Sequence, residues 1–256
     1  MALLKRLNAL IRGCCSLNRN REFTLLRRRA GESARGTLLD IGSGDGFWTE
    51  RFARLFAASY GLEPNPRALR TAQELHGART HYVHGFAEQL CFEEEVFDCV
   101  VSVSCFEHFR SAQAALHETF RVLKPGGRLA LSVDSLLPAN SSKEFRSWHA
   151  GKYFVTEYFS EKRLTEMLVA AGFIVERQHT RHLITSRLSG RIRELYLHHP
   201  RLLLLLFPLL YLLVLAGDAW GEQLPGQIVV MSARRPSRLA GGAQPSLELN
   251  QAPTFY

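Results

Sequence analysis

The sequence has few cysteines, and they follow no disulfide or metal-binding pattern. Its 256 residues include five cysteines, an odd number, and no two of them are spaced as Cys-x-x-Cys. We therefore expect neither a disulfide framework nor a metal site. This cysteine usage is typical of a reduced protein that faces the cytosol.

No apolar run is long enough for an ordinary membrane span. The longest uncharged run, residues 202–217, is 16 residues long and lies between Arg201 and Asp218. It would form about 24 Å of helix, whereas the hydrocarbon core of a bilayer is about 30 Å thick. Pro208 would also kink such a helix. A crossing is therefore not expected, although five consecutive leucines are too apolar for an ordinary surface helix.

Acidic residues are almost absent from the first 30 residues. This segment holds eight basic residues and one acid, so it carries +7 of the total net charge of +8. Leucine and isoleucine recur at helical spacing in residues 1–12, which predicts a basic amphipathic helix suited to an anionic membrane surface. Two alternatives are an ordinary helix over the ligand cleft and a mitochondrial presequence. A nucleic-acid partner is not expected, because the chain shows no added RNA-binding module.

The most informative segment is LLDIGSGDG, residues 38–46. Three apolar residues predict a short buried strand, and the glycines at 42, 44 and 46 predict a turn in which the backbone can approach a ligand closely. FWTERFARLF follows as a predicted helix. The dinucleotide fingerprint G-x-G-x-x-G would need a glycine at Phe47, so a nicotinamide oxidoreductase is disfavoured.

Asp40 and the G-x-G-x-G turn resemble motif I of the class I Rossmann-like methyltransferases that use S-adenosyl-L-methionine (SAM). The resemblance covers about residues 36–182, and FRVLKPGGRLALS is similar to the element before strand five in the quinone-biosynthesis C- and O-methyltransferases. It implies an α/β fold with a seven-stranded, mostly parallel sheet, an antiparallel last strand and helices on both faces. It also implies SAM as the cofactor.

The cofactor site is expected at the carboxyl ends of the first strands. Glu63 ends the second predicted strand and is placed to accept hydrogen bonds from ribose hydroxyls. The family has Gly-Asp-Ala-Glu after strand three, where this chain has Phe86 in place of the Asp; the ring can stack on adenine or fill the wall of the pocket. The residues assigned to the cofactor are Asp40, Gly42, Ser43, Gly44, Gly46, Glu63, Phe86, Ala87 and Ser102.

Residues near two later strand ends are candidates for the chemistry. Glu107 and His108 follow strand four at the ligand-facing edge, and His149 is the second candidate base. A base is needed only if the acceptor is a hydroxyl or a carbon acid. In related quinone O-methyltransferases acids and a histidine near this position are associated with a divalent metal, but no complete ligand set is identified here. The predicted acceptor pocket uses Trp148, Tyr153 and Tyr158.

The apolar run lies in an expected insertion, residues 190–224. It lies between the predicted strands six, within GFIVERQHTRHLI (172–184), and seven, within GQIVVMSARR (226–235). Those strands pair antiparallel in the family, so the insertion must leave and return on one face of a membrane. We expect an interfacial or shallow re-entrant helical segment. The alternative is a helix buried against the protein itself or a dimer partner.

The sequence thus predicts a basic helical region at 1–30, a methyltransferase domain at 31–235 and a disordered tail at 236–256. The expected function is methyl transfer from SAM to a small lipophilic or membrane-embedded acceptor by a protein peripherally bound to a membrane at its cytosolic face, or on the mitochondrial matrix side if the presequence interpretation holds. Candidate acceptors are a polyprenyl-linked or quinone-like molecule, a phospholipid amine and a lipid-linked glycan. Alternatives are a soluble small-molecule methyltransferase that dimerises through the apolar helix, and a catalytically silent SAM-binding protein.

Overall fold

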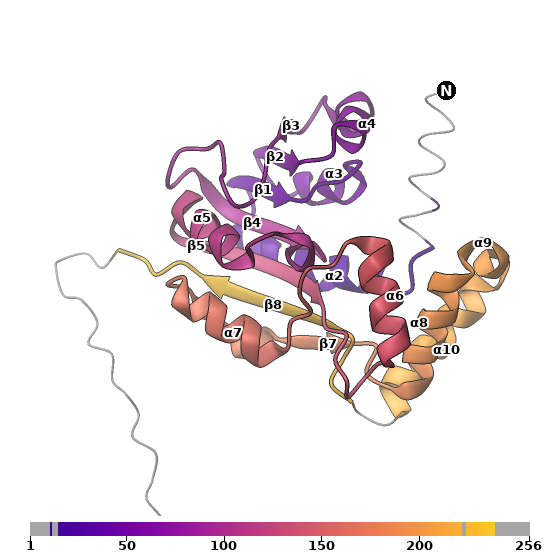
Figure 1. Cartoon of the computed structure of the whole chain (residues 1–256). Coiled ribbons are helices and arrows are strands. Elements are labelled where there is room, and N and C mark those ends of the chain that lie inside the picture. Colours follow the sequence, from indigo (N-terminus) through magenta and orange to yellow (C-terminus); the bar gives the residue numbers. More distant parts are fainter. Residues whose placement is uncertain (1–10, 12–14, 222–223, 239–256) are drawn as a thin grey trace, which may run out of the picture.

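A computed structural model describes residues 11, 15–221 and 224–238, which form one mixed sheet with helices on both faces (Figure 1). The strand order is β3-β2-β1-β4-β5-β8-β6, and β7 also pairs with β8. The first five strands pair in parallel, and β8 pairs antiparallel with β5, β6 and β7. The strands are β1 (Thr37–Ile41), β2 (Ala58–Glu63), β3 (His81–His84), β4 (Phe97–Val103), β5 (Leu123–Asp134), β6 (Ile174–Val175), β7 (Arg181–Leu183) and β8 (Ile228–Arg234).

The predicted fold class is confirmed, with one difference in the strand count. The sequence predicts one sixth strand before the insertion, but the structure divides it into β6 and β7, separated by a short 3₁₀ turn at Arg177–His179. Glu176 lies at the break. Its buried carboxylate accepts hydrogen bonds from Arg128, Ser232 and Arg234, and these bonds hold it against the sheet where the strand ends.

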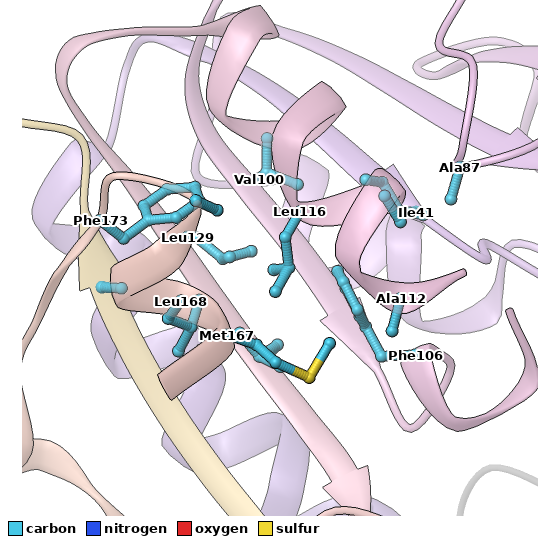
Figure 2. Close-up of a cluster of buried hydrophobic side chains, with 14 of the residues drawn as sticks. Ile41, Ala87, Val100, Phe106, Ala112, Leu116, Leu129, Met167, Leu168 and Phe173 are labelled. Carbon is cyan, nitrogen blue, oxygen red and sulfur yellow. The ribbon is translucent and has the colours of Figure 1, made fainter. Parts of the chain in front are cut away.

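Alternate residues of the central strands point to the two faces of the sheet. Leu39, Val100 and Leu129 belong to a core under α5 and α7, part of which Figure 2 shows. Leu38 and Ala130 belong to a second core, which α2, α3, α8 and α10 cover. The longer helices are α2 (Arg19–Ala30), α3 (Phe47–Ala53), α4 (Pro66–His76), α5 (Ala112–Val122), α6 (Lys143–Tyr153), α7 (Glu161–Ala170), α8 (Arg187–His198) and α10 (Phe207–Trp220).

Helix α2 packs on the sheet, although the sequence shows it only as a basic segment. Leu26 and Ala30 are buried in the second core. Glu22, the one acid of the segment, is fully buried and accepts hydrogen bonds from the hydroxyls of Ser104 and Ser132. The predicted amphipathic helix at residues 1–12 lies outside the described residues except for Ile11, and the predicted tail does so from residue 239 onward.

The chain between β7 and β8 forms a group of helices at one end of the sheet (Figure 1). Helix α8 is followed by α9 (Pro200–Leu203), a 3₁₀ turn η4 (Leu204–Leu206) and α10. Asp218 of α10 accepts hydrogen bonds from Arg21, from Ser189 and from the backbone of Thr185, which anchors the returning helix to the domain.

The outer surface of this helical group is apolar. Val214 and Gly217 of α10 are buried, whereas large leucine side chains on the other side are exposed. The exposed leucines of α9, η4 and α10 are Leu202, Leu205, Leu206, Leu209, Leu212 and Leu213. We call them the leucine surface. Within the part of the chain that the structure describes, no helix combines the length and the apolar character that a membrane span requires.

Candidate functional site

The glycine turn after β1 requires glycine at its first and third positions. Gly42 has φ +79°, and a Cβ atom there would lie 2.1 Å from Sγ of Cys105. Gly46 has φ +80°, and its Cβ would lie 2.5 Å from the hydroxyl of Tyr82. Both backbone conformations are unfavourable for residues with a side chain. The turn therefore keeps an open backbone surface at the carboxyl edge of the sheet.

Asp40 lies behind the turn, and its side chain does not line the cavity in front of the turn, which is described below. The side chain is 2% exposed, and Oδ2 accepts a 2.6 Å hydrogen bond from the hydroxyl of Thr49 in α3. Burial raises the pKa of Asp40 to about 7. Ser102 is buried similarly and donates to the carbonyl of Ile41 at 3.0 Å. Both side chains fix the end of β1 from below the turn.

Glu63 lines the cavity and is held by backbone groups. Oε2 accepts from the amide of Gly44 at 2.8 Å, and Oε1 accepts from the amide of Asn65 at 2.9 Å. A carboxylate has about four lone-pair sites, so each oxygen can accept one more hydrogen bond. Glu63 is therefore fixed in position and still able to bind the two hydroxyls of a ribose.

A cavity of about 470 Å³ lies at the carboxyl ends of β1 and β2, within the usual size range of a small-molecule site. We call it the nucleoside cavity. Gly42 and Glu63 form one side, and Phe86 and Ala87 form another. The ring of Phe86 is 54% exposed, so it is free to cover a planar base. An open glycine backbone, a diol acceptor and an aromatic wall together fit a nucleoside.

A second, smaller cavity of about 160 Å³ adjoins the first. We call it the polar chamber. His108 and Tyr153 line both cavities, so these two side chains border both spaces. Its other polar walls come from Arg19, Asp134 and Arg193. Five elements far apart in the sequence thus supply one small polar space.

Asp134 organises the charges of the polar chamber. Its Oδ1 accepts a 2.6 Å hydrogen bond from Arg193, and Oδ2 lies 3.5 Å from Nε2 of His149. Burial opposes ionisation of Asp134, but the charges of Arg193 and Arg19 hold its pKa below the usual value. Burial lowers the pKa of His149 to about 4, so this ring is neutral at neutral pH.

The three candidate catalytic residues occupy different positions. His108 is half-buried and lines both cavities; burial lowers its pKa, so the ring is neutral and able to accept a proton. His149 lines the chamber, but its Nδ1 lies 2.9 Å from the hydroxyl of Tyr158 and its Nε2 faces Asp134. Both nitrogens of His149 therefore have protein neighbours.

Glu107 is completely buried behind His108 and lines neither cavity. Its Oε1 accepts from the backbone amide of Asp134 at 3.1 Å. Burial and the charge of Asp134 raise the pKa of Glu107 to about 8. This carboxyl group joins the turn after β4 to the end of β5, so its visible contacts are structural.

Of the three aromatic residues predicted to bind the acceptor, the structure brings one to the cavities. Tyr153 lies at their junction. Trp148 packs on His198 with 3.8 Å between ring centroids, and Tyr158 bonds to His149. Neither Trp148 nor Tyr158 lines the chamber, although Tyr158 contacts His149, which does. No group of three metal-ligating side chains occurs in the described ranges.

Sequence reasoning missed three charged residues of the chamber. Asp134 ends β5 at the ligand-facing edge and directly follows the strand that the sequence predicts, a signal comparable to the one that identified Glu63. Arg19 and Arg193 carry no comparable signal, because one lies in a basic segment and the other in the insertion. Their role depends on how α2 and α8 fold back onto the sheet.

The central part of the chain is similar to known methyltransferases. Residues 39–131 match the model of a methyltransferase domain. The chain is 31% identical over 165 residues to the biotin biosynthesis bifunctional protein BioHC of Cellvibrio japonicus, which covers 63% of this chain and 32% of that protein. It is 34% identical over 123 residues to the ubiquinone/menaquinone biosynthesis C-methyltransferase UbiE of Vibrio cholerae, which covers 44% of this chain and 47% of that one.

The chain thus spans about a third to a half of the length of these two relatives. Among solved structures, phosphoethanolamine N-methyltransferase 2 of Haemonchus contortus in complex with SAM is similar in fold. The TM-score is 0.63 at 21% identity, and the match covers 85% of this chain and 53% of that one. Its similarity bears on the fold alone.

Proposed function

We propose that this chain, a class I SAM-dependent methyltransferase domain that resembles the quinone-biosynthesis group, transfers a methyl group from SAM to a small lipophilic acceptor. The observation that carries this proposal is the junction of two cavities. A nucleoside-sized cavity and a polar chamber meet at His108 and Tyr153. A donor in the first and an acceptor in the second would therefore lie next to each other, as methyl transfer requires.

The residues of the nucleoside cavity suit SAM. The open backbone at Gly42 admits the cofactor chain, and Glu63 would accept hydrogen bonds from the ribose hydroxyls. Phe86 would cover the adenine in place of the usual acid, and Ala87 would contact its edge. The turn itself would be shaped by its own residues Ser43, Gly44 and Gly46. It would be supported from behind by Asp40 and Ser102. When bound, SAM supplies an activated methyl group with its own leaving group.

His108 is the proposed base when the acceptor is a hydroxyl. The neutral imidazole would accept the hydroxyl proton, which would leave the acceptor oxygen able to receive the methyl group that SAM supplies. His149, Asp134 and Arg193 would orient the acceptor and His108 from the other side of the chamber. Glu107 would hold the turn that carries His108.

The lipophilic nature of the acceptor is inferred from the leucine surface. Leu202 is 76% exposed and Leu205 is 90% exposed, and a water-facing surface of this kind is unfavourable. We propose that this surface lies in the interface of a membrane, at its cytosolic face, or on the matrix side if residues 1–30 act as a presequence. The competing proposal is that the same surface forms a dimer interface of a soluble small-molecule enzyme.

Two experiments test the proposal. Purified protein is incubated with membrane lipid extract and SAM labelled on its methyl group, and the label that enters the organic phase is counted. We expect labelled lipid with the wild type and much less with Glu63→Ala. Binding of S-adenosylhomocysteine without any transfer would support the catalytically silent alternative.

Flotation with anionic liposomes tests the membrane part. Leu205→Glu combined with Leu212→Glu changes only exposed side chains, so the fold should persist while flotation is lost. A wild type that stays dimeric in detergent-free buffer and does not float would favour the dimer interface instead.

A further inference from the structure

We infer that the apolar tail of the acceptor lies in a passage that leads from the polar chamber, between residues 15–19 and α8–α9, to the leucine surface. This inference rests on the proposed function and adds the route by which the acceptor reaches the site. This route is separate from the nucleoside cavity that would admit the cofactor. That cavity lies at the carboxyl ends of β1 and β2.

A third cavity provides the space for this passage. Its volume is about 460 Å³, and its outer walls include Ile11, Tyr196, Pro200 and Leu204. It shares six lining residues with the polar chamber, which are Ser16, Asn18, Arg19, Tyr153, Arg193 and Leu197. The chamber thus shares lining residues with both the nucleoside cavity and this outer cavity, and Tyr153 borders all three.

The walls change from charged to apolar along this path. At the inner end Arg193 is 4% exposed, and its Nε has no hydrogen-bond partner among the described residues. A buried donor of this kind is unfavourable unless a ligand or a water molecule supplies an acceptor. At the outer end the cavity is bounded by Leu204 and the ring of Tyr196. The gradient fits a molecule with a polar head inside and an apolar tail outside.

The size of the chamber supports the same arrangement. Its volume of about 160 Å³ is close to that of an engineered cavity of about 150 Å³ that binds benzene. Only a small head group fits there. The remainder of any larger acceptor must extend into another space, and the outer cavity is the adjoining one on the side away from the cofactor.

The outer end of the passage lies beside the leucine surface. Leu204 lines the cavity, whereas the next residue, Leu205, is 90% exposed on the same turn. Leu202 of α9 is exposed as well. An apolar tail leaving the cavity at Leu204 would therefore lie next to Leu205 of the leucine surface.

A photoreactive probe tests the passage without requiring turnover. Dodecyl alcohol with a diazirine on its last carbon is irradiated with the full-length protein, and labelled peptides are identified by mass spectrometry. We expect label on the lining residues Tyr196, Leu197, Pro200 and Leu204 and on residues 15–17. Leu204→Trp, which narrows the cavity from its wall, should reduce this labelling about tenfold. Val169→Trp, which enlarges an exposed side chain of α7 that lines none of the three cavities, should label as the wild type does.

Each other outcome has a defined meaning. Equal labelling of the wild type and Leu204→Trp, or label confined to the leucine surface, overturns the passage. S-adenosylhomocysteine affinity serves as the folding control; if Leu204→Trp loses it, Leu204→Phe is the milder narrowing variant and must show the reduced labelling. Labelling of the passage in a wild type that neither binds S-adenosylhomocysteine nor methylates lipid would contradict the proposed function and leave the passage standing.

Discussion

The nucleoside cavity and the polar chamber lie side by side, but the chain builds them in different ways. The nucleoside cavity draws most of its walls from residues 41–110, in which each strand and the turn after it supply neighbouring residues. The chamber collects Arg19, His108, Asp134, His149 and Arg193 from five separate elements. One site is therefore encoded locally, and the other exists only after the ends of the chain fold back onto the sheet.

The two sites also differ in how they hold charge. Glu63 is fixed by two backbone amides, so its orientation depends on the strand ends alone. Asp134 is fixed by side chains, above all by Arg193 from the inserted helix α8. Changes in the insertion should therefore affect acceptor binding much more than cofactor binding.

Replacing the proposed base should lower the rate of methyl transfer strongly and leave cofactor affinity nearly unchanged. In His108→Gln we expect kcat to fall by about 10²–10⁴, the usual contribution of a general base, with S-adenosylhomocysteine affinity nearly unchanged. Burial lowers the pKa of His108, so the acidic limb of the wild-type rate profile should lie below pH 6.5 and disappear in the variant. His149→Gln is the control and should lose less activity. Normal turnover in His108→Gln would exclude this residue as the base.

The glycine turn offers a matched pair of variants in the nucleoside cavity. Gly42→Ala places a Cβ against Cys105 at φ +79°, whereas a Cβ at Gly44 would meet no atom within 4 Å, although its φ is +57°. We expect S-adenosylhomocysteine affinity to fall about 100-fold in Gly42→Ala and clearly less in Gly44→Ala. Isothermal titration calorimetry measures both. Equal losses would mean that backbone strain alone, without the close contact, decides binding.

Glu63→Gln should weaken cofactor binding without affecting the chemical step. Loss of the charged acceptor is expected to reduce S-adenosylhomocysteine affinity about tenfold, in line with the value of hydrogen bonds to charged groups. KM for SAM should rise by a similar factor while kcat stays within about twofold. Steady-state kinetics check this split. A fall in kcat with unchanged KM would place Glu63 in the chemical step instead.

Asp40→Asn should leave cofactor affinity unchanged, because the side chain lines no cavity. Its effect should appear in stability. Burial raises the pKa of Asp40 from 3.8 to about 7, so the folded protein retains a proton that the unfolded chain releases. Wild-type stability should therefore fall as pH rises from about 4 to about 7, by at most about 4 kcal/mol.

The asparagine variant should lack this part of the pH dependence and be more stable than the wild type above pH 7. Urea unfolding at pH 5 and pH 8 measures the difference. Parallel pH curves for the two proteins would show that Asp40 is ionised normally in the fold.

The sequence was sufficient for the locally encoded site. Spacing alone placed the glycine turn and Glu63 at the same sheet edge, and the structure brings Phe86 and Ala87 to the same cavity. The spacing of residues in the sequence could not show which side chains face a cavity and which are buried behind its wall. Asp40 and Glu107 are adjacent in sequence to residues that line the cavities, but both side chains turn away and are buried.

The chamber could not be derived in the same way. Arg193 reaches Asp134 only because α8 packs on the sheet, and no local pattern in the sequence encodes that contact. The break between β6 and β7 was missed for a related reason. It depends on Glu176 binding Arg128, a residue 48 positions earlier in the chain.

The most direct test of this account is a calorimetric titration of S-adenosylhomocysteine into the wild type, Glu63→Ala and Arg193→Lys. We expect binding to the wild type, little or none to Glu63→Ala and near-normal binding to Arg193→Lys, because the nucleoside cavity is built without α8. Absence of binding to folded wild-type protein, or equal losses in the two variants, would contradict it.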